Sequence, residues 1–298
     1  MDKKARTASL SIMSNTFLTL LKLITGILMG SISVISEAVH SAIDLLAAII
    51  AFLSVRQSSK PADIEHPYGH GKYENVGSIV EALLIIVAAI MIIAEAVPRF
   101  SHPAEVTSLN FGVAVMAISV VVNIFVSNRL MKVGKETDSP ALEGDALHLR
   151  TDVLTSLGIF AGLAAIKLTG LMILDPIIAF GVALFIIKAG FELIGKSFRA
   201  LVDERLTEEE LNVIKSVLEE NSVGFLEFHE LRTRKAGSQR FVDLHLVFPC
   251  DQPIKDIYDT CKELEKKIED RLSGTDVVIK VEPCDEHCVE CNYDCIHK

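Results

Sequence analysis

The sequence contains no tryptophan, and aromatic residues of all kinds make up only 6% of its 298 residues. An aromatic belt at either membrane surface would therefore have to consist of phenylalanine and tyrosine. No cysteine precedes Cys250, so all six cysteines fall in the C-terminal part of the chain. No His-Glu-x-x-His motif occurs, which argues against the metalloproteases that bind zinc through such a helix.

Apolar residues, in contrast, are abundant. Half of the residues are hydrophobic and the mean hydropathy is +0.40, which is typical of a polytopic membrane protein with a soluble part. The N-terminal MDKKAR followed by LSIMSNTFLTLLKLITGILMG starts like a signal peptide. Its apolar run is too long for one and no small-residue cleavage site follows, so the sequence predicts a retained first helix.

Charge divides the chain into two parts. Residues 1–202 hold 16 basic and 16 acidic residues, whereas residues 203–298 hold 13 basic and 23 acidic residues and carry the whole net charge of −10. The cysteines lie on the acidic side of this division. We therefore predict a transmembrane domain over 1–202, a soluble domain over 203–283 and a Cys/His-rich tail over 284–298.

Six windows are long and apolar enough to cross a membrane, which takes about 20 residues. They cover 9–29, 32–55, 76–98, 109–131, 142–168 and 171–194. The fifth window is only half apolar, because its first part reads ALEGDALHLRTD. We retain it because an even number of transmembrane helices places both termini on one side, as the loop charges favour.

Lysine and arginine mark the cytoplasmic loops of membrane proteins. They gather at the N-terminus, in the 56–75 and 129–140 loops and after the sixth window, whereas the opposite loops carry only Arg99. Both termini, and with them the soluble domain, are therefore predicted to be cytoplasmic.

The soluble domain is predicted to be a small α+β unit of the order αββαβ. The stretch 207–221 is an amphipathic helix that opens with a Thr-x-x-Glu capping box, Thr207 and Glu210. Two stretches that alternate apolar and polar residues flank an Ala-Gly-Ser turn and indicate a hairpin; a second helix and a third strand, DVVIKVE, follow. This order suits an open sheet with helices on one face.

Two predicted transmembrane helices contain the same pair of ionisable residues. HSAID gives His40 and Asp44, and LHLRTD gives His148 and Asp152. Positions i and i+4 share a helix face, so the two pairs together would supply two imidazoles and two carboxylates, a tetrahedral set that suits zinc. Ionisable residues inside a membrane span usually have a functional role. The alternative is two separate polar pairs, each satisfied by packing or by a water-filled crevice.

Three segments resemble the cation diffusion facilitator transporters, and specifically their bacterial zinc/proton antiporter branch. They are SEAVHSAIDLLAA, KPADIEHPYGHGKYE and EGDALHLRTDVLTS, and they occur in the order typical of that family. The resemblance implies a homodimer in the inner cell membrane that exports divalent metal in exchange for protons. It implies a transporter rather than an enzyme, with a metallochaperone-like soluble domain.

The same resemblance assigns the transport site to His40, Asp44, His148 and Asp152. A histidine at the first position resembles zinc-selective members, so Zn²⁺ is favoured over the alternatives Fe²⁺, Cd²⁺ and Co²⁺. Ligand type alone cannot decide between these metals, because selectivity lies in geometry.

The resemblance also assigns a second zinc site to the loop after the second helix, at Asp63, His66 and His70. Without the family, a solvated loop would be the better explanation of these residues. Lys72 matches a lysine that pairs with an aspartate after the sixth helix, here Asp203; the alternative is a lysine that marks the cytoplasmic side.

In related transporters the soluble domain holds a binuclear zinc site made of histidines and an aspartate. His229 and His245 match two of its positions, whereas the others fall on Tyr258, Lys280 and Glu282. A lysine ammonium cannot bind zinc unless it is deprotonated, so the binuclear site is expected to be incomplete. The two histidines with Glu282 could bind one metal, or they could simply occupy a strand face.

The tail CDEHCVECNYDCIHK concentrates soft metal ligands, namely Cys284, His287, Cys288, Cys291, Cys295 and His297. In a reducing cytosol such clustering indicates metal binding rather than disulfides. An iron–sulfur enzyme shares part of this spacing but needs a scaffold that the sequence does not contain, and a disordered tail with reactive thiols is the remaining alternative.

A basic cluster, Arg232, Arg234, Lys235 and Arg240, falls in an acidic domain, so we interpret it as a solvated hairpin and expect no nucleic-acid partner. The sequence thus predicts proton-coupled Zn²⁺ efflux from the cytoplasm by a homodimer in the lipid bilayer. The alternative is a membrane-bound sensor or scaffold that binds divalent metal without moving it.

Overall fold

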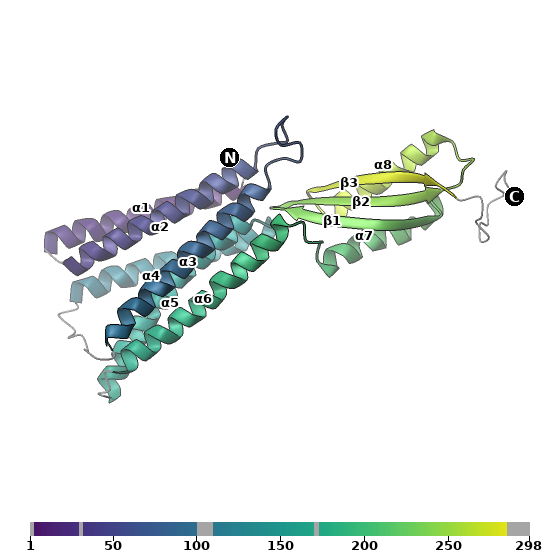
Figure 1. Ribbon diagram of the computed structural model, residues 1–298. Helices are drawn as coiled ribbons and strands as arrows, with labels where there is room; N and C mark the ends of the chain where they lie inside the picture. The colour runs from purple at the N-terminus through teal and green to yellow at the C-terminus, as the bar shows by residue number, and fades with distance from the viewer. Residues whose placement is uncertain (1–2, 30–31, 100–109, 170–172, 285–298) are drawn as a thin grey trace. The chain divides into compact units, whose positions relative to one another are not determined.

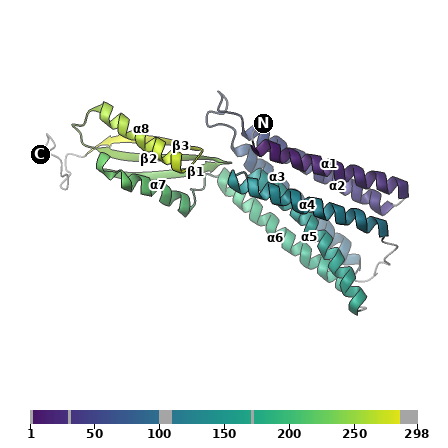
Figure 2. The same ribbon diagram turned by 180° about the vertical axis from the view of Figure 1, so that it is seen from behind.

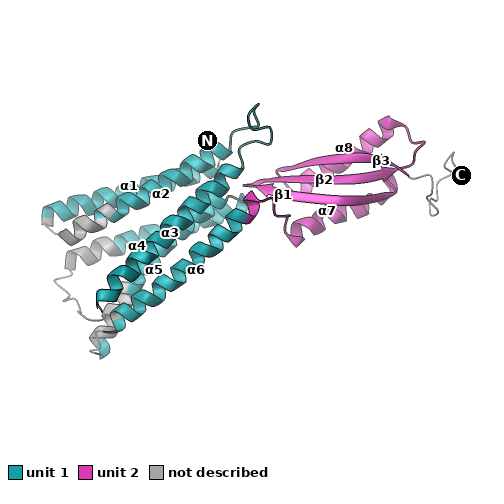
Figure 3. Cartoon of the chain, in the orientation of Figure 1, with its two compact units in different colours: residues 1–198 teal, residues 199–298 magenta. Residues whose placement is uncertain are grey.

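The computed structural model describes residues 3–29, 32–99, 110–169 and 173–284 (Figure 1). The chain divides into two compact units, residues 1–198 and 199–298 (Figure 3). The first unit is a bundle of long helices, and the second combines helices with a β-sheet.

Six long helices form the first unit and confirm the predicted number. They are α1 (Lys3–Met29), α2 (Ile32–Ser58), α3 (Lys72–Arg99), α4 (Asn110–Glu136), α5 (Pro140–Thr169) and α6 (Leu174–Leu201). At 1.5 Å per residue, a helix of 27 residues is about 40 Å long, which exceeds the hydrocarbon core of a bilayer. Large apolar side chains such as Leu28 and Phe125 are exposed on the outside of the bundle, as expected for a surface that faces lipid.

Helix α5 is unusual in this bundle because its N-terminal half is polar. Within the described residues α1, α2, α3, α4 and α6 are each long and apolar enough to cross a membrane, and α5 combines a polar N-terminal half, ALEGDALHLRTD, with an apolar C-terminal half. Its N-terminal half is nevertheless buried: Asp145 is fully buried, and Leu142 and Leu149 pack with α4 residues in one apolar cluster. Because neighbouring helices cover this half of α5, its polar residues are shielded from lipid.

One end of the bundle is closed by a buried ionic cluster around Glu74, which we call the Glu74 cluster. Glu74 lies in the first turn of α3 and is fully buried. Its carboxylate accepts hydrogen bonds from Lys4 Nζ and Ser58 Oγ, both at 2.7 Å, and from Ser139 Oγ. The cluster therefore ties the starts of α1, α3 and α5 to the end of α2.

The second unit has the predicted order αββαβ. Its elements are α7 (Glu208–Glu220), β1 (Glu227–Ala236), β2 (Gln239–Phe248), α8 (Ile254–Arg271) and β3 (Thr275–Pro283), with a short 3₁₀ turn at Ser222–Gly224. Central β2 pairs antiparallel with β1 and parallel with β3. Both helices cover one face of the sheet, as the two opposite views show (Figures 1 and 2).

Alternation along β2 separates a core face from an open face. Val242, Leu244, Leu246 and Phe248 pack into the core with residues of α7 and α8. Since successive side chains of a strand point to opposite faces, His245 belongs to the face that the helices leave uncovered. This alternation places the predicted histidine ligand on the open face.

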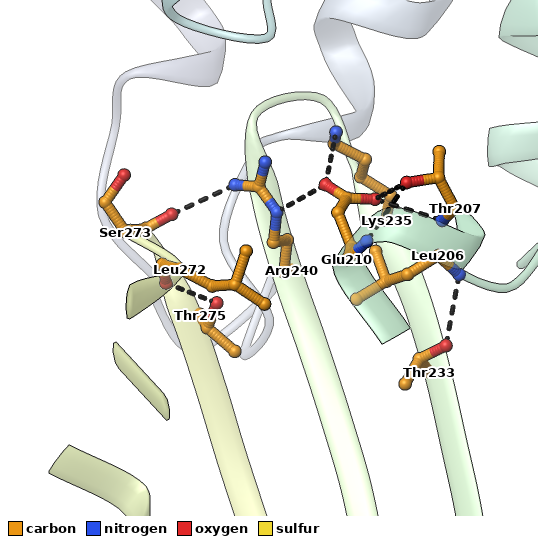
Figure 4. A network of polar contacts seen from close by, with 9 residues as sticks. All are labelled: Leu206, Thr207, Glu210, Thr233, Lys235, Arg240, Leu272, Ser273 and Thr275. Carbon is orange, nitrogen blue, oxygen red and sulfur yellow. Dashed lines mark hydrogen bonds and ion pairs between the residues drawn. The ribbon is translucent and has the colours of Figure 1, made fainter. Parts of the chain in front are cut away.

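The predicted capping box is present at the start of α7 and is extended by the sheet (Figure 4). Glu210 accepts a hydrogen bond from the Thr207 backbone N–H at 3.1 Å. Its other carboxylate oxygen accepts from Arg240 Nε at 2.7 Å and Lys235 Nζ at 3.2 Å. Partial burial raises the pKa of Glu210, but the Thr207 N–H and the two cations outweigh it and lower the pKa to about 2. Two members of the basic cluster are thus engaged inside this unit.

Candidate metal sites

The first candidate site lies inside the helical bundle, where α2 and α5 face each other. Ligand atoms of His40, Asp44 and Asp152 all lie within 4.8 Å of one another. His148 Nε2 lies 3.3 Å from Asp44 Oδ1, and His40 Nε2 lies 3.9 Å from the same oxygen. The four residues of the predicted intramembrane set are therefore brought together around Asp44.

These four residues differ in their access to solvent. The side chains of Asp44 and His148 are 8% and 5% exposed, whereas that of His40 is 46% exposed. A cavity of about 360 Å³ reaches the site and is lined by His40, Asp44 and Asp152, together with more distant polar residues. A small hydrated ion could thus reach the carboxylates through this cavity.

The cavity lies toward the end of the bundle that is opposite to the Glu74 cluster. Its lining residue Lys22 follows Lys4 by 18 residues on α1, and Glu95 follows Glu74 by 21 residues on α3. Along a helix these separations correspond to about 27–32 Å. The cavity therefore extends from the site toward one end of the bundle, and the buried ion pair lies at the other.

A buried carboxyl group that sequence reasoning missed, Glu81, lies on α3. Glu81 is fully buried, and neither of its carboxylate oxygens has a hydrogen-bond partner among the described residues. Helix α5 approaches it closely at Gly144, where a Cβ atom would lie 3.3 Å from the Glu81 Cβ. An ionisable residue inside a predicted span was the available signal, since such residues are rarely incidental.

Asp145, one turn before His148, does not contact that imidazole through a hydrogen bond. Its Oδ1 accepts a hydrogen bond from Ser11 Oγ at 3.0 Å. Neither Asp145 Oδ2 nor His148 Nδ1 has a hydrogen-bond partner in the described part of the chain. Asp145 therefore links α5 to α1 in this conformation.

The second candidate site is the loop between α2 and α3. Ligand atoms of Asp63, His66 and His70 lie within 4.8 Å of one another. His66 Nδ1 is 3.2 Å from Asp63 Oδ1, and His70 Nε2 is 3.4 Å from Asp63 Oδ2. Gly69 has a φ of +77°, a left-handed conformation that suits glycine and turns the chain back toward Asp63.

Neighbouring groups hold these loop residues ready for a cation. His70 Nδ1 lies 3.2 Å from the Pro61 carbonyl oxygen, which favours the tautomer that leaves Nε2 with a lone pair facing Asp63. The His66 backbone N–H donates to Asp63 and lowers the pKa of its carboxyl. The loop thus presents one carboxylate and two imidazoles to a single point.

The third candidate site lies on the open face of the sheet. His229 of β1 and His245 of β2 are directly opposite each other in the strand register. His229 Nε2 is 3.0 Å from Glu282 Oε2, and His245 Nδ1 is 3.1 Å from Glu282 Oε1. A β-bulge follows His229, where Glu230 adopts a φ of +49°, and it brings Glu230 Oε2 to 3.5 Å from His245 Nε2.

Lys280 competes for the carboxylate of this third site. Its Nζ lies 2.7 Å from Glu282 Oε1, and this hydrogen bond is the main cause that lowers the pKa of Glu282. The ammonium therefore already occupies one ligand oxygen. Tyr258, at another position expected from the family, is largely exposed on α8. The arrangement offers three ligands to one ion.

Two further predictions, the tail metal site and the pairing of Lys72 with Asp203, are not tested by the described residues. His287, Cys288, Cys291, Cys295 and His297 lie outside the described residues, and Cys284 is the last described residue, where its backbone N–H donates to the Phe248 carbonyl at 2.9 Å. Asp203 lies 3.6 Å from Arg234 within the second unit. Its pairing with Lys72, which belongs to the first unit, stays a prediction.

Comparisons with known proteins agree on one family. Residues 8–202 match the model of the cation efflux transmembrane domain, and residues 206–284 match that of the cation efflux protein cytoplasmic domain. An uncharacterized transporter of Synechocystis is 35% identical over 266 residues, which cover 89% of this chain and 86% of that protein.

Other relatives cover comparable lengths. The cation-efflux pump FieF of Pectobacterium atrosepticum is 29% identical over 254 residues, or 85% of this chain and 84% of that protein. A solved structure of CzrB in its zinc form is 39% identical; the match covers 27% of this chain and 92% of the CzrB chain, with a TM-score of 0.26.

Proposed function

This chain belongs to the cation diffusion facilitator family of cation efflux transporters, and we propose that it moves Zn²⁺ out of the cytoplasm in exchange for protons. The transported ion would bind to His40, Asp44, His148 and Asp152. The observation that supports this proposal is the convergence of α2 and α5 on Asp44, with His148 Nε2 at 3.3 Å and ligand atoms of His40 and Asp152 within 4.8 Å.

Zinc fits the donor set of this site. Two imidazole nitrogens and two carboxylate oxygens match the four-coordinate geometry that Zn²⁺ prefers. Two carboxylates balance the charge of one divalent cation, which lowers the cost of holding it between helices. Cd²⁺, Co²⁺ and Fe²⁺ remain competitors, because the same ligands accept them and selectivity depends on geometry.

Proton coupling follows from the ligands themselves. Each must be deprotonated to bind metal, so protons and Zn²⁺ compete for the same four side chains. Without metal, the 3.3 Å contact between His148 and Asp44 can hold a proton between them. A site that binds metal on one side and protons on the other would exchange the two ions without a separate proton path.

The conformation of the bundle suits the outward-facing half of a transport cycle. With a cytoplasmic N-terminus, the Glu74 cluster would close the cytoplasmic end, and the 360 Å³ cavity would face outward. This arrangement suits the state in which metal leaves and protons enter. Opening toward the cytoplasm would then require the Lys4–Glu74 contact to separate. We further propose that the protein acts as a homodimer in the inner cell membrane.

The loop site and the sheet site are proposed as resident metal sites rather than transport sites. Asp63, His66 and His70 already converge, and the His70 tautomer suits a ligand. His229, His245 and Glu282 could hold a single ion if Lys280 withdrew from Glu282. A sensor or scaffold could use these same sites, so their occupancy does not distinguish sensing from transport.

Flux through reconstituted vesicles tests the proposal. Purified protein in proteoliposomes, loaded with a zinc-sensitive dye, is given external Zn²⁺ with and without a pH gradient. We expect zinc uptake that depends on the gradient, together with a pH change of opposite direction. Asp44→Ala and Asp152→Ala should each abolish uptake.

Glu192→Ala is the matched control, because Glu192 lies on α6 with its side chain 69% exposed and does not line the cavity. Its uptake should equal that of the unmodified protein. Vesicles that stay empty while the protein binds zinc would favour the sensor alternative. Uptake that survives both aspartate substitutions would place the transport site elsewhere.

A further inference from the structure

Lys22 is a basic residue within the membrane-spanning part of α1 that the proposed transport chemistry does not use. It is 8% exposed, and its ammonium donates a hydrogen bond to Ser41 Oγ on α2 at 2.8 Å. A lysine near the end of a transmembrane helix commonly extends toward the membrane surface. This ammonium is instead directed into the bundle.

Neighbouring contacts fix the ammonium beside the candidate transport site. Ser41 directly follows His40 and is 4% exposed. Its backbone carbonyl accepts a hydrogen bond from Thr19 Oγ1 at 3.0 Å. Thr19 and Lys22 are three residues apart on α1 and therefore share a face. The two α1 side chains hold the same residue of α2, so Lys22 has a defined position.

Lys22 also lines the cavity that reaches the site. Its ionisable lining comprises three carboxylates, those of Asp44, Asp152 and Glu95, together with Lys22 and the imidazole of His40. With the carboxylates ionised and the imidazole neutral, the cavity carries a net charge of −2. One divalent cation neutralises this charge, whereas a monovalent cation leaves the cavity charged.

We propose that Lys22 is a specificity-determining residue that sets the charge of the transport cavity to match one divalent cation. Asp44, which lines the cavity, is only 8% exposed, so an uncompensated net charge beside it is costly and the neutral, divalent-loaded state is favoured. The fixed ammonium also repels the bound ion, and a transported ion must bind weakly enough to leave. This inference rests on the proposed transport function of the same site.

Replacing Lys22 with methionine keeps the unbranched side chain up to the position of Cε and removes its charge. The cavity of this variant then carries a net charge of −3, and its charge stays negative when one divalent ion is bound. We expect zinc to bind about tenfold more tightly, because removal of a nearby like charge favours the cation. Transport should show a lower KM and a lower maximal rate together, since the ion leaves more slowly.

The experiment combines equilibrium binding with flux. Zn²⁺ is titrated into the purified full-length protein in detergent against a chromophoric chelator, and the Asp44→Asn/Asp152→Asn double variant gives the contribution of the other sites. Lys22→Arg keeps the charge and should bind zinc like the unmodified protein. Lys188→Met is the matched control, because Lys188 lies on α6 with its side chain 75% exposed, 3.7 Å from Glu192. It should change neither binding nor flux.

An unchanged or weaker affinity in Lys22→Met, or a Lys22→Arg variant that behaves like Lys22→Met, would overturn the inference. If Lys22→Met does not give a monodisperse protein, Lys22→Gln is measured in the same way. Tighter binding in a protein that moves no zinc would refute the transport function but keep the role of Lys22. Normal zinc transport by Lys22→Met, with an unaltered affinity for zinc, would keep the transport function but refute the role of Lys22.

Discussion

Replacing Glu210 with glutamine tests how the sheet reinforces the start of α7. Glutamine is also a good capping-box residue, so the contact with the Thr207 N–H can survive. The change removes the negative charge that faces Arg240 and Lys235 at 2.7 Å and 3.2 Å. It therefore isolates the tertiary ionic contribution from the local capping contribution.

The expected magnitude follows from the pKa of Glu210. A decrease from its ordinary value of 4.5 to about 2 corresponds to a stabilisation of about 3 kcal/mol at neutral pH. Partial exposure to solvent screens the ion pairs, so we expect Glu210→Gln to lower the free energy of unfolding of this unit by about 1–2 kcal/mol. Because the folded-state pKa is depressed, this stabilisation is complete above about pH 4.5 and disappears as the pH falls through about 2.

Amide hydrogen exchange of the full-length protein in detergent measures this effect locally. Peptides from α7 and β2 should exchange faster in the variant at pH 7, and the difference in free energy should fall by about half near pH 3, after correction for intrinsic rates. Glu208→Gln is the control, because Glu208 pairs with Arg205 on the same helix end and is exposed. A Glu210→Gln protein as stable as wild type, or a difference independent of pH, would refute the assigned ionic contribution.

Three further predictions concern the bundle and the tail. Glu74→Gln should lower the melting temperature in detergent, because it removes the anion that the buried Lys4 contacts at 2.7 Å, and the loss of one partner of a buried ion pair typically costs about 3–5 kcal/mol. A second substitution, Lys4→Met, should recover part of that loss. Gly77→Ala should destabilise the bundle by about 1–3 kcal/mol, because an added Cβ would overlap Ser54 Oγ. Gly181→Ala is the control, because no atom of a neighbouring helix in the described part of the chain lies within 4 Å of the added Cβ, and thermal melting compares the two variants. Truncation after Pro283 should preserve zinc uptake but lower the number of zinc ions bound per chain, which atomic absorption measures. An unchanged number of bound zinc ions would show that the tail does not bind zinc.

Several features of this protein are encoded locally and could be predicted from sequence. The helices of the bundle follow from long apolar runs, and the αββαβ order follows from the change between helical and alternating patterns. The Thr207–Glu210 capping box needs only four consecutive residues, so the sequence predicts it directly. The i,i+4 spacing of His40 with Asp44, and of His148 with Asp152, fixes which residues share a helix face.

Other features depend on contacts between residues far apart in the chain. The polar first half of α5 is tolerated only because other helices cover it, and the composition of the helix cannot predict that burial. Likewise, Lys4 and Glu74 meet although 70 residues separate them, and no local pattern predicts that pairing. Arg240 and Lys235 reach Glu210 from the sheet, which turns a local cap into a tertiary ion cluster.

The sequence by itself thus determined the two-part organisation, the helices and strands, and the residue types able to bind a metal, because these depend on composition and short-range spacing. Only the tertiary structure decided that His148 of α5 meets Asp44 of α2, and that Lys22 of α1 lines the same cavity. Helix packing is a non-local outcome of burying apolar faces, so the charge of that cavity can be counted only after the helices have been placed together.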